Sequence, residues 1–124
     1  MTTKELRIGN MLNYCGQIVY VMGIYPDNKV ELGYFADSIG FTRSIDDDNL
    51  KPIPLIELLF KKFGFEWKNH ALRKDSICIR SYGGDWAIFL SNESLNFKID
   101  LKYAHNLQNL YHSLTGEELT PITP

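Results

Sequence analysis

The chain has 124 residues, of which 44% are hydrophobic and 23% are charged, the size and usage of one ordinary globular domain. Its 13 Lys and Arg residues are balanced by 15 Asp and Glu residues, and neither half of the chain concentrates positive charge. Binding to a nucleic-acid polymer is therefore disfavoured, because it requires a strongly basic surface. No apolar run is long enough to cross a bilayer and the N-terminus lacks the apolar core of a signal peptide. We therefore expect a cytoplasmic protein with no membrane partner.

The two cysteines, Cys15 and Cys78, lie far apart and outside any CxxC or Cys/His spacing. In a cytoplasmic chain such residues are usually small buried hydrophobes, so we expect free thiols. No metal-binding or cofactor motif occurs, and we expect neither group. The seven Tyr, seven Phe and two Trp residues are more than a core requires, and they can fill a core, line a pocket or form an interface.

The first half of the chain is expected to form short strands separated by turns. Cys15-Gly16 and Pro26-Asp27-Asn28 carry the turn signals. Residues 17–24 are apolar on both alternating faces, which predicts a central strand covered on both sides. The expected strands are 7–14, 17–24, 29–35, 41–45 and 50–53. This spacing predicts a small curled sheet or an SH3-like barrel.

An acidic run, Asp46-Asp47-Asp48, lies between the last two of these strands. A calcium loop requires alternating carboxylates, a central Gly and a distal Glu, and consecutive aspartates cannot converge in that way. The run is therefore predicted to be a solvated turn.

The second half is expected to form a helix, an antiparallel meander and a final helix. Pro54 and Gly64 delimit a helix over 55–63, and Gly116 ends one over 101–114. Strands are predicted over 65–68, 76–81, 85–91 and 95–101. The fold class is α+β in one domain, residues 1–124, with a β-rich half (1–54), a mixed half (55–119) and a loose tail (120–124).

The final helix has two distinct faces. At 100° per residue, one arc is apolar and is expected to face the core; it holds Tyr103, Ala104, Leu107, Leu110, Tyr111 and Leu114. The opposite face carries His105, Gln108 and His112, which we expect to be an exposed face or a contact for a ligand or partner. The two histidines are about 10.5 Å apart along the axis, too far to share one zinc ion.

Two further segments are candidate binding sites. The segment Tyr82-Gly83-Gly84-Asp85-Trp86 is expected to be a hairpin turn, although its glycines could approach an anion and its rings could stack on a base. Arg80 could pair with a phosphate there. Arg7 is a candidate near the N-terminus.

Several segments also resemble a known family. They are Lys4–Asn10 (KELRIGN) at the start, Pro52–Leu55 and Lys62–Phe65 in the middle, and His105–Leu119 (HNLQNLYHSLTGEEL) at the end. Together they resemble a family of small uncharacterised proteins from Bacteroidetes and their phages and mobile elements. The resemblance implies a phage or mobile-element protein acting in a host cytoplasm, and it implies no chemistry.

These observations favour a non-enzymatic binding module that engages a host protein or a small ligand, with homo-oligomerisation as an option. One alternative is an anti-defence sponge that sequesters a nucleotide immune signal, through Arg80, Tyr82, Gly83 and Trp86. Another is a small hydrolase that uses His105 or His112, although no nucleophile is spaced to serve it.

Overall fold

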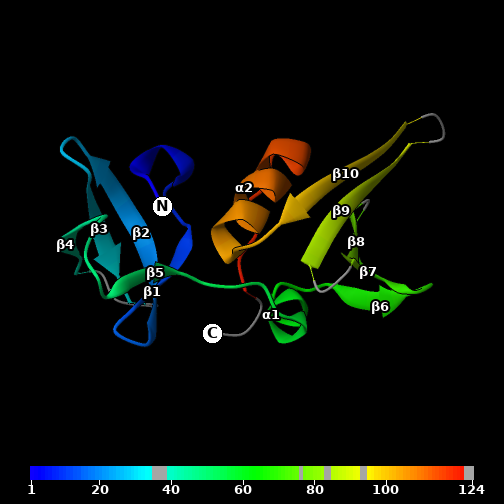
Figure 1. The fold of residues 1–124 in the computed structure, drawn as a ribbon, viewed down its shortest axis with the longest axis horizontal. Coiled ribbons are helices and arrows are strands. Elements are labelled where there is room, and N and C mark those ends of the chain that lie inside the picture. Colours follow the sequence, from blue (N-terminus) through cyan, green and yellow to red (C-terminus); the bar gives the residue numbers. More distant parts are fainter. Residues whose placement is uncertain (35–38, 76, 83–84, 93–94, 122–124) are drawn as a thin grey trace. The chain divides into compact units, whose positions relative to one another are not determined.

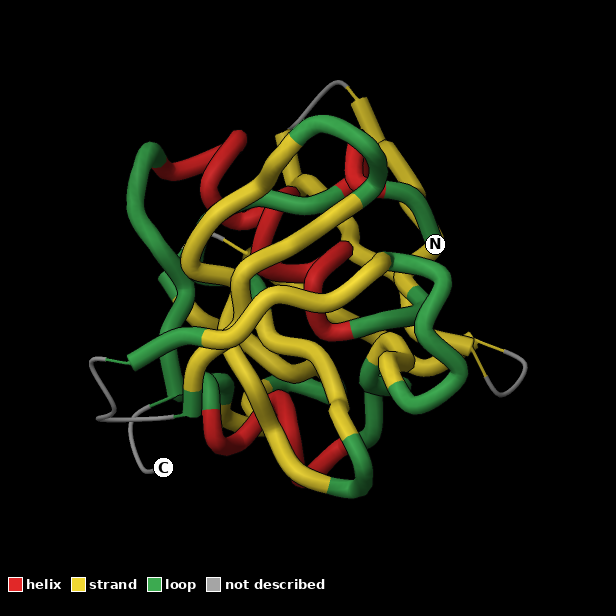
Figure 2. Tube along the Cα trace, turned by 90° about the vertical axis from the view of Figure 1, so that its left-hand side faces the viewer, coloured by secondary structure: helices red, strands yellow, loops and turns green. Residues whose placement is uncertain are grey.

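The computed structural model describes residues 1–34, 39–75, 77–82, 85–92 and 95–121. Strands make up most of its regular structure (Figure 2). The chain divides into two compact units, residues 1–54 with 103–119 and residues 55–102 with 120–124. Each unit contains one antiparallel sheet.

The first unit opens with a short 3-10 helix, η1 (Thr3–Glu5), and continues into five strands (Figure 1). These are β1 (Met11–Tyr14), β2 (Gln17–Tyr25), β3 (Lys29–Gly33), β4 (Phe41–Ser44) and β5 (Leu50–Pro52). They pair antiparallel in the order β4-β3-β2-β1-β5, so all five predicted strands are present. Within the described residues β4 and β5 are not paired with each other, and the sheet is open. The prediction of a small sheet is confirmed, and the closed-barrel alternative was wrong.

The predicted turns close the first two hairpins of this sheet. Cys15 (φ 52°) and Gly16 (φ 83°) connect β1 to β2, and Asp27 (φ 66°) and Asn28 (φ 57°) lie between β2 and β3. Two successive positive φ values are typical of the tight hairpin turns whose twist matches that of the strands. Asn and Asp tolerate this conformation better than other non-glycine residues.

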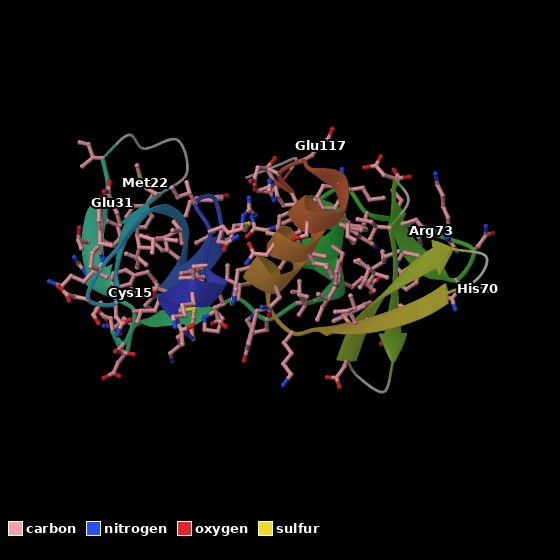
Figure 3. All side chains as sticks on the ribbon, turned by 90° about the horizontal axis from the view of Figure 1, so that it is seen from above. Cys15, Met22, Glu31, His70, Arg73 and Glu117 are labelled. Carbon is pink, nitrogen blue, oxygen red and sulfur yellow. The ribbon has the colours of Figure 1, made fainter. Side chains whose placement is uncertain are left out.

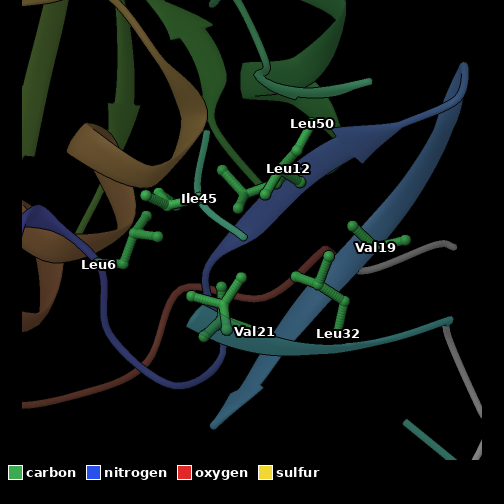
Figure 4. Close-up of a cluster of buried hydrophobic side chains, with 8 residues drawn as sticks. Leu6, Leu12, Val19, Val21, Leu32, Ile45 and Leu50 are labelled. Carbon is green, nitrogen blue, oxygen red and sulfur yellow. The ribbon is translucent and has the colours of Figure 1, made fainter. Parts of the chain in front are cut away.

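One face of the first sheet forms a hydrophobic core. Val19 and Val21 of β2 point into it together with Leu12 and Leu32 from the neighbouring strands (Figure 4). The prediction that β2 is covered on both faces was wrong, because Ile18 on its other face is exposed. Apolar residues on both faces indicated that the strand is central, which it is, but they did not indicate what covers each face.

The second unit begins with α1 (Glu57–Lys62), shorter than the predicted helix over 55–63, and continues into five strands. These are β6 (Glu66–Lys68), β7 (Ala71–Lys74), β8 (Ile77–Tyr82), β9 (Asp85–Asn92) and β10 (Leu95–Leu101), in the order β10-β9-β8-β7-β6. The meander is confirmed, but β7 was not predicted. The turn between β6 and β7 consists of Asn69 and His70, both at positive φ. Histidine is not among the usual turn signals.

The core of the second unit is built on paired strand positions. Leu72, Ile79 and Ile88 are opposite one another across β7, β8 and β9, and all three are buried. Phe60 of α1 adds an aromatic contact, with its ring centroid 4.7 Å from that of Trp86.

The last helix, α2 (Ala104–Thr115), belongs to the first unit. It ends as predicted at Gly116, whose φ of 76° is left-handed and whose N–H bonds to the carbonyl of His112. This helix was expected to belong with the mixed half, residues 55–119, whereas in the structure it contacts β1. Among the described residues, no helix is both long and apolar enough to span a membrane.

Candidate functional site

The polar side of α2 is largely an internal surface of the first unit. Gln108 is only 1% exposed, and its side chain makes three hydrogen bonds to backbone groups. Its Oε1 accepts from the N–H of Met11 at 2.8 Å, and its Nε2 donates to the carbonyls of Gly9 and Leu119 at 3.1 Å each. These bonds join α2 to the start of β1 and to the segment that follows the helix.

Asn109 continues this network toward the surface. Its Nδ2 donates to the carbonyl of Glu5 at 2.7 Å, and its Oδ1 accepts from Asn10 Nδ2 at 2.8 Å. Arg7 reaches the same oxygen at 3.4 Å and also pairs with Glu118. The first and the last of the segments singled out for the resemblance are thus bonded to each other, and Arg7 is part of that bonding.

His105 is enclosed without hydrogen bonds. It is 1% exposed, and neither ring nitrogen has a hydrogen-bond partner among the described residues. Its ring stacks on Tyr103 at 5.8 Å, and its Nε2 lies 3.7 Å from the carboxylate of Glu5. Burial lowers the pKa of His105, the Glu5 carboxylate acts in the opposite direction, and the amino group of Met1 lowers it further.

These positions correct the expectation of an exposed helix face. His105 and Gln108 are buried, while Leu114, predicted to face the core, is exposed. His112 is partly exposed, with its Nε2 3.8 Å from the Glu118 carboxylate. The helical spacing was right, but α2 packs against backbone groups that need polar partners. Apolarity alone therefore did not identify its buried side.

The hairpin candidate is only partly described. Gly83 lies outside the described residues, and Tyr82 is described as the last residue of β8 without its side chain. Trp86 is opposite Ser81, and Arg80 is opposite Ala87. Because neighbouring strand residues point to opposite faces, Arg80 and Trp86 lie on different sides of the sheet. The Trp86 ring packs against Phe60.

A row of aromatic side chains, which the sequence analysis did not single out, lines the edge of the first core. It consists of Tyr34, Phe41 and Tyr14, and we call it the aromatic row. Ring centroids are 5.6 Å apart between Tyr34 and Phe41 and 5.4 Å apart between Phe41 and Tyr14. Tyr14 and Phe41 are partly buried and pack on the core, whereas Tyr34 is 37% exposed.

Strand alternation explains why these rings meet. Tyr14 follows the buried Leu12 by two residues and Tyr34 follows the buried Leu32 by two, while Phe41 is opposite Leu32. Residues two apart on a strand share a face, so Tyr14 and Phe41 lie on the core side of the sheet. Tyr34 directly follows β3 and meets the ring of Phe41. Since the rings come from three separate segments, no local motif could reveal the row; the aromatic surplus was its only sequence signal.

Arg43, two residues after Phe41 on β4, lies over the aromatic row. Its guanidinium carbon is 4.8 Å from the centroid of Phe41 and 5.4 Å from that of Tyr14. Its Nε donates to Tyr14 Oη at 2.7 Å, and its Nη1 donates to the carbonyl of Thr42 at 2.8 Å. The hydrogen bond to Tyr14 raises the pKa of Arg43 above its ordinary value, and the Asp47 carboxylate acts in the same direction. Arg43 is therefore a fixed cation on the rings.

The acidic run forms the turn that was predicted, and we call Asp46–Asp48 the acidic turn. The N–H of Asp47 donates to the carbonyl of Ser44 at 3.1 Å, and Asp47 Oδ1 accepts from the N–H of Asn49 at 2.9 Å. In the described part of the chain, no three His, Cys, Asp or Glu side chains come together as metal ligands.

Both cysteines are free thiols, Cys15 exposed and Cys78 buried. Cys15 lies at the turn after β1, at the other end of the sheet from Met22 (Figure 3).

A scan against protein-family models found no match, and searches of curated proteins and of solved structures found no similar protein.

Proposed function

We propose that the protein is a non-enzymatic binding module that engages another protein through the aromatic row and Arg43. The observation that carries the proposal is the contiguous arrangement of Tyr34, Phe41 and Tyr14, with the guanidinium of Arg43 fixed over the last two rings. Tyr and Arg are enriched among the residues that dominate binding energy at protein interfaces.

The rigidity of the side chains in and over the aromatic row supports this assignment. Phe41 and Tyr14 pack on the core, and two hydrogen bonds hold Arg43 in place. A partner would therefore meet side chains that have already lost most of their rotamer freedom, which reduces the entropy cost of association. The exposed ring of Tyr34 is the part of the row most open to contact.

The two alternative functions have less support. A nucleotide sponge was expected to use Arg80 and Trp86 together, and these residues lie on opposite faces of their sheet. A hydrolase was expected to use His105 or His112. His105 is 1% exposed and so out of reach of a substrate. His112 is partly exposed, but the group beside it is the carboxylate of Glu118 rather than a hydroxyl or thiol that it could activate.

The proposal is tested by selecting binders from a random peptide library displayed on phage. The wild-type protein serves as bait, and each enriched peptide is retested on Tyr34→Ala and Tyr25→Ala. Tyr25 is the control because it is 44% exposed, similar to Tyr34, and is hydrogen-bonded to Glu31 rather than part of the aromatic row. We expect Tyr34→Ala to weaken binding roughly ten-fold, the loss of a contact worth about 1.4 kcal/mol, and Tyr25→Ala to leave it unchanged.

Sedimentation of the same three proteins tests whether the partner is a second copy of the chain. If the wild-type protein forms a dimer that is weakened by Tyr34→Ala but not by Tyr25→Ala, the partner is a second copy of the chain. If neither peptide binding nor self-association depends on Tyr34, the proposed function is overturned.

A further inference from the structure

The acidic turn lies between the two strands that supply Arg43 and Tyr14. It begins directly after β4, which carries Arg43. At its other end the carbonyl of Asn49 accepts a hydrogen bond of 3.1 Å from the N–H of Cys15, the residue after Tyr14. The carboxylates therefore flank one end of the aromatic row.

The charges at this end are unequal. Three consecutive aspartates, Asp46, Asp47 and Asp48, lie beside the guanidinium of Arg43, and Asp47 is close enough to raise its pKa. Two lysines on the flanking strands, Lys29 and Lys51, alternate with the buried Val30 and Leu50 and so lie on the other face of the sheet. Asp46 and Asp48 are exposed. A partner that meets the row and the turn together therefore meets a surplus of negative charge, which favours a cationic partner and disfavours an acidic one.

The rings favour a cation as well. The guanidinium of Arg43 already lies within 5.4 Å of the centroids of Phe41 and Tyr14, the distance range in which a cation is attracted to an aromatic face. Tyr34 continues the row beyond Phe41 and is exposed. Its ring offers the same kind of surface to a cation from outside.

We infer that the partner is an extended protein segment carrying arginine or lysine, with one basic side chain over Tyr34 and another paired with Asp46 and Asp48. This inference rests on the proposed function and specifies its partner. Same-face side chains of an extended chain are about 7 Å apart, slightly more than one ring spacing of the row. Tyr34 and Tyr14 are separated by two ring spacings, of 5.6 and 5.4 Å, and the acidic turn lies at the Tyr14 end. Two basic residues with three residues between them therefore have the right reach.

Fluorescence anisotropy with three labelled probes tests this chemistry: short repeats of Arg-Ala, Ser-Ala and Glu-Ala. We expect the Arg-Ala repeat to bind roughly ten-fold or more tightly than Ser-Ala, and Glu-Ala to bind most weakly. Raising NaCl from about 50 mM to about 500 mM should weaken Arg-Ala binding, because exposed charges are screened. The double variant Asp46→Asn/Asp48→Asn should lower its affinity roughly three- to thirty-fold.

The matched control removes two charges elsewhere in the same unit. Glu5→Gln/Glu117→Gln changes exposed residues outside the acidic turn, one in η1 and one after α2, and should leave the affinity for Arg-Ala within about two-fold of wild type. Asp47 is left unchanged because its carboxylate bonds to the turn backbone. Equal losses in both double variants would overturn the inference, since net charge alone would then explain binding.

The outcomes separate the inference from the proposed function. Peptides selected by the phage library that depend on Tyr34 but carry no basic residues would overturn the inference and leave the binding module standing. If no probe and no selected peptide depends on Tyr34, both are overturned.

Discussion

His105 illustrates how a single residue couples packing to pH. Its ring is buried in the first turn of α2, without a hydrogen-bond partner among the described residues and beside one carboxylate, that of Glu5. The start of a helix also disfavours a positive charge. The folded first unit therefore holds this imidazole in its neutral form more readily than the unfolded chain does.

We expect the free energy of unfolding to decrease as the pH falls below about 6.5, the ordinary pKa of histidine in an unfolded chain. Burial lowers the pKa of His105 in the folded state, so between those two values the unfolded chain binds more protons. The contribution of His105 is fully present above about pH 6.5 and is lost toward the folded-state pKa, with a slope of up to about 1.4 kcal/mol per pH unit. Urea unfolding at a series of pH values measures it.

Two substitutions isolate this effect. His105→Phe keeps a ring against Tyr103 and removes the titrating group. The pH dependence of the free energy of unfolding, between pH 6.5 and the folded-state pKa, should then lose the contribution assigned to His105. Glu5→Gln removes the carboxylate that raises the pKa of His105, so the loss of stability should extend to lower pH. A slope unchanged in His105→Phe would show that other groups cause it.

At the scale of elements, much of the fold could be predicted because its signals are local. Gly16 and Asn28 mark hairpins, and Gly116 ends α2 at the predicted residue. β7 was missed because the Asn69-His70 turn carries its positive φ values without a glycine. The aromatic row could not be predicted, since Tyr14, Tyr34 and Phe41 meet only through strand pairing.

Gln108, which was predicted to lie on an exposed or contact face of the final helix, is buried and bonds α2 to the start of β1. Replacing Gln108 with alanine would leave the N–H of Met11 and two carbonyls without these partners. Each buried group left unpaired costs about 1–3 kcal/mol, reduced where water can enter. We expect Gln108→Ala to lower the free energy of unfolding by about 2–4 kcal/mol, measured by chemical denaturation.

Ser113→Ala is the control within the same helix. Ser113 is exposed, so its replacement should change stability by no more than about 0.5 kcal/mol. Hydrogen exchange should also show faster exchange of the Met11 amide in Gln108→Ala. An unchanged rate there would contradict the assigned bond.

At the scale of the whole molecule, the first unit is built from both ends of the chain. Residues 1–54 and 103–119 share it, while residues 55–102 and 120–124 form a second unit with its own core and sheet. The division at residue 54 was expected from the sequence, because the β-rich half ends there and a helix was predicted directly after Pro54. The return of α2 to the first unit was not visible, because it depends on Gln108 and Asn109 bonding to residues near the N-terminus.

Leu119 tests this closure, because it anchors the segment after α2. It is 1% exposed, and its carbonyl accepts from Gln108. Leu119→Ala keeps that carbonyl but removes buried side-chain volume, which should cost about 2–3 kcal/mol. Leu114→Ala makes the same chemical change at a site 41% exposed and should cost no more than about 0.5 kcal/mol, since alanine also favours the helix. If residues 116–119 help to close the first unit, Leu119→Ala will also speed hydrogen exchange in β1. If both variants lower the free energy of unfolding equally and exchange in β1 is unchanged, residues 116–119 do not stabilise the first unit.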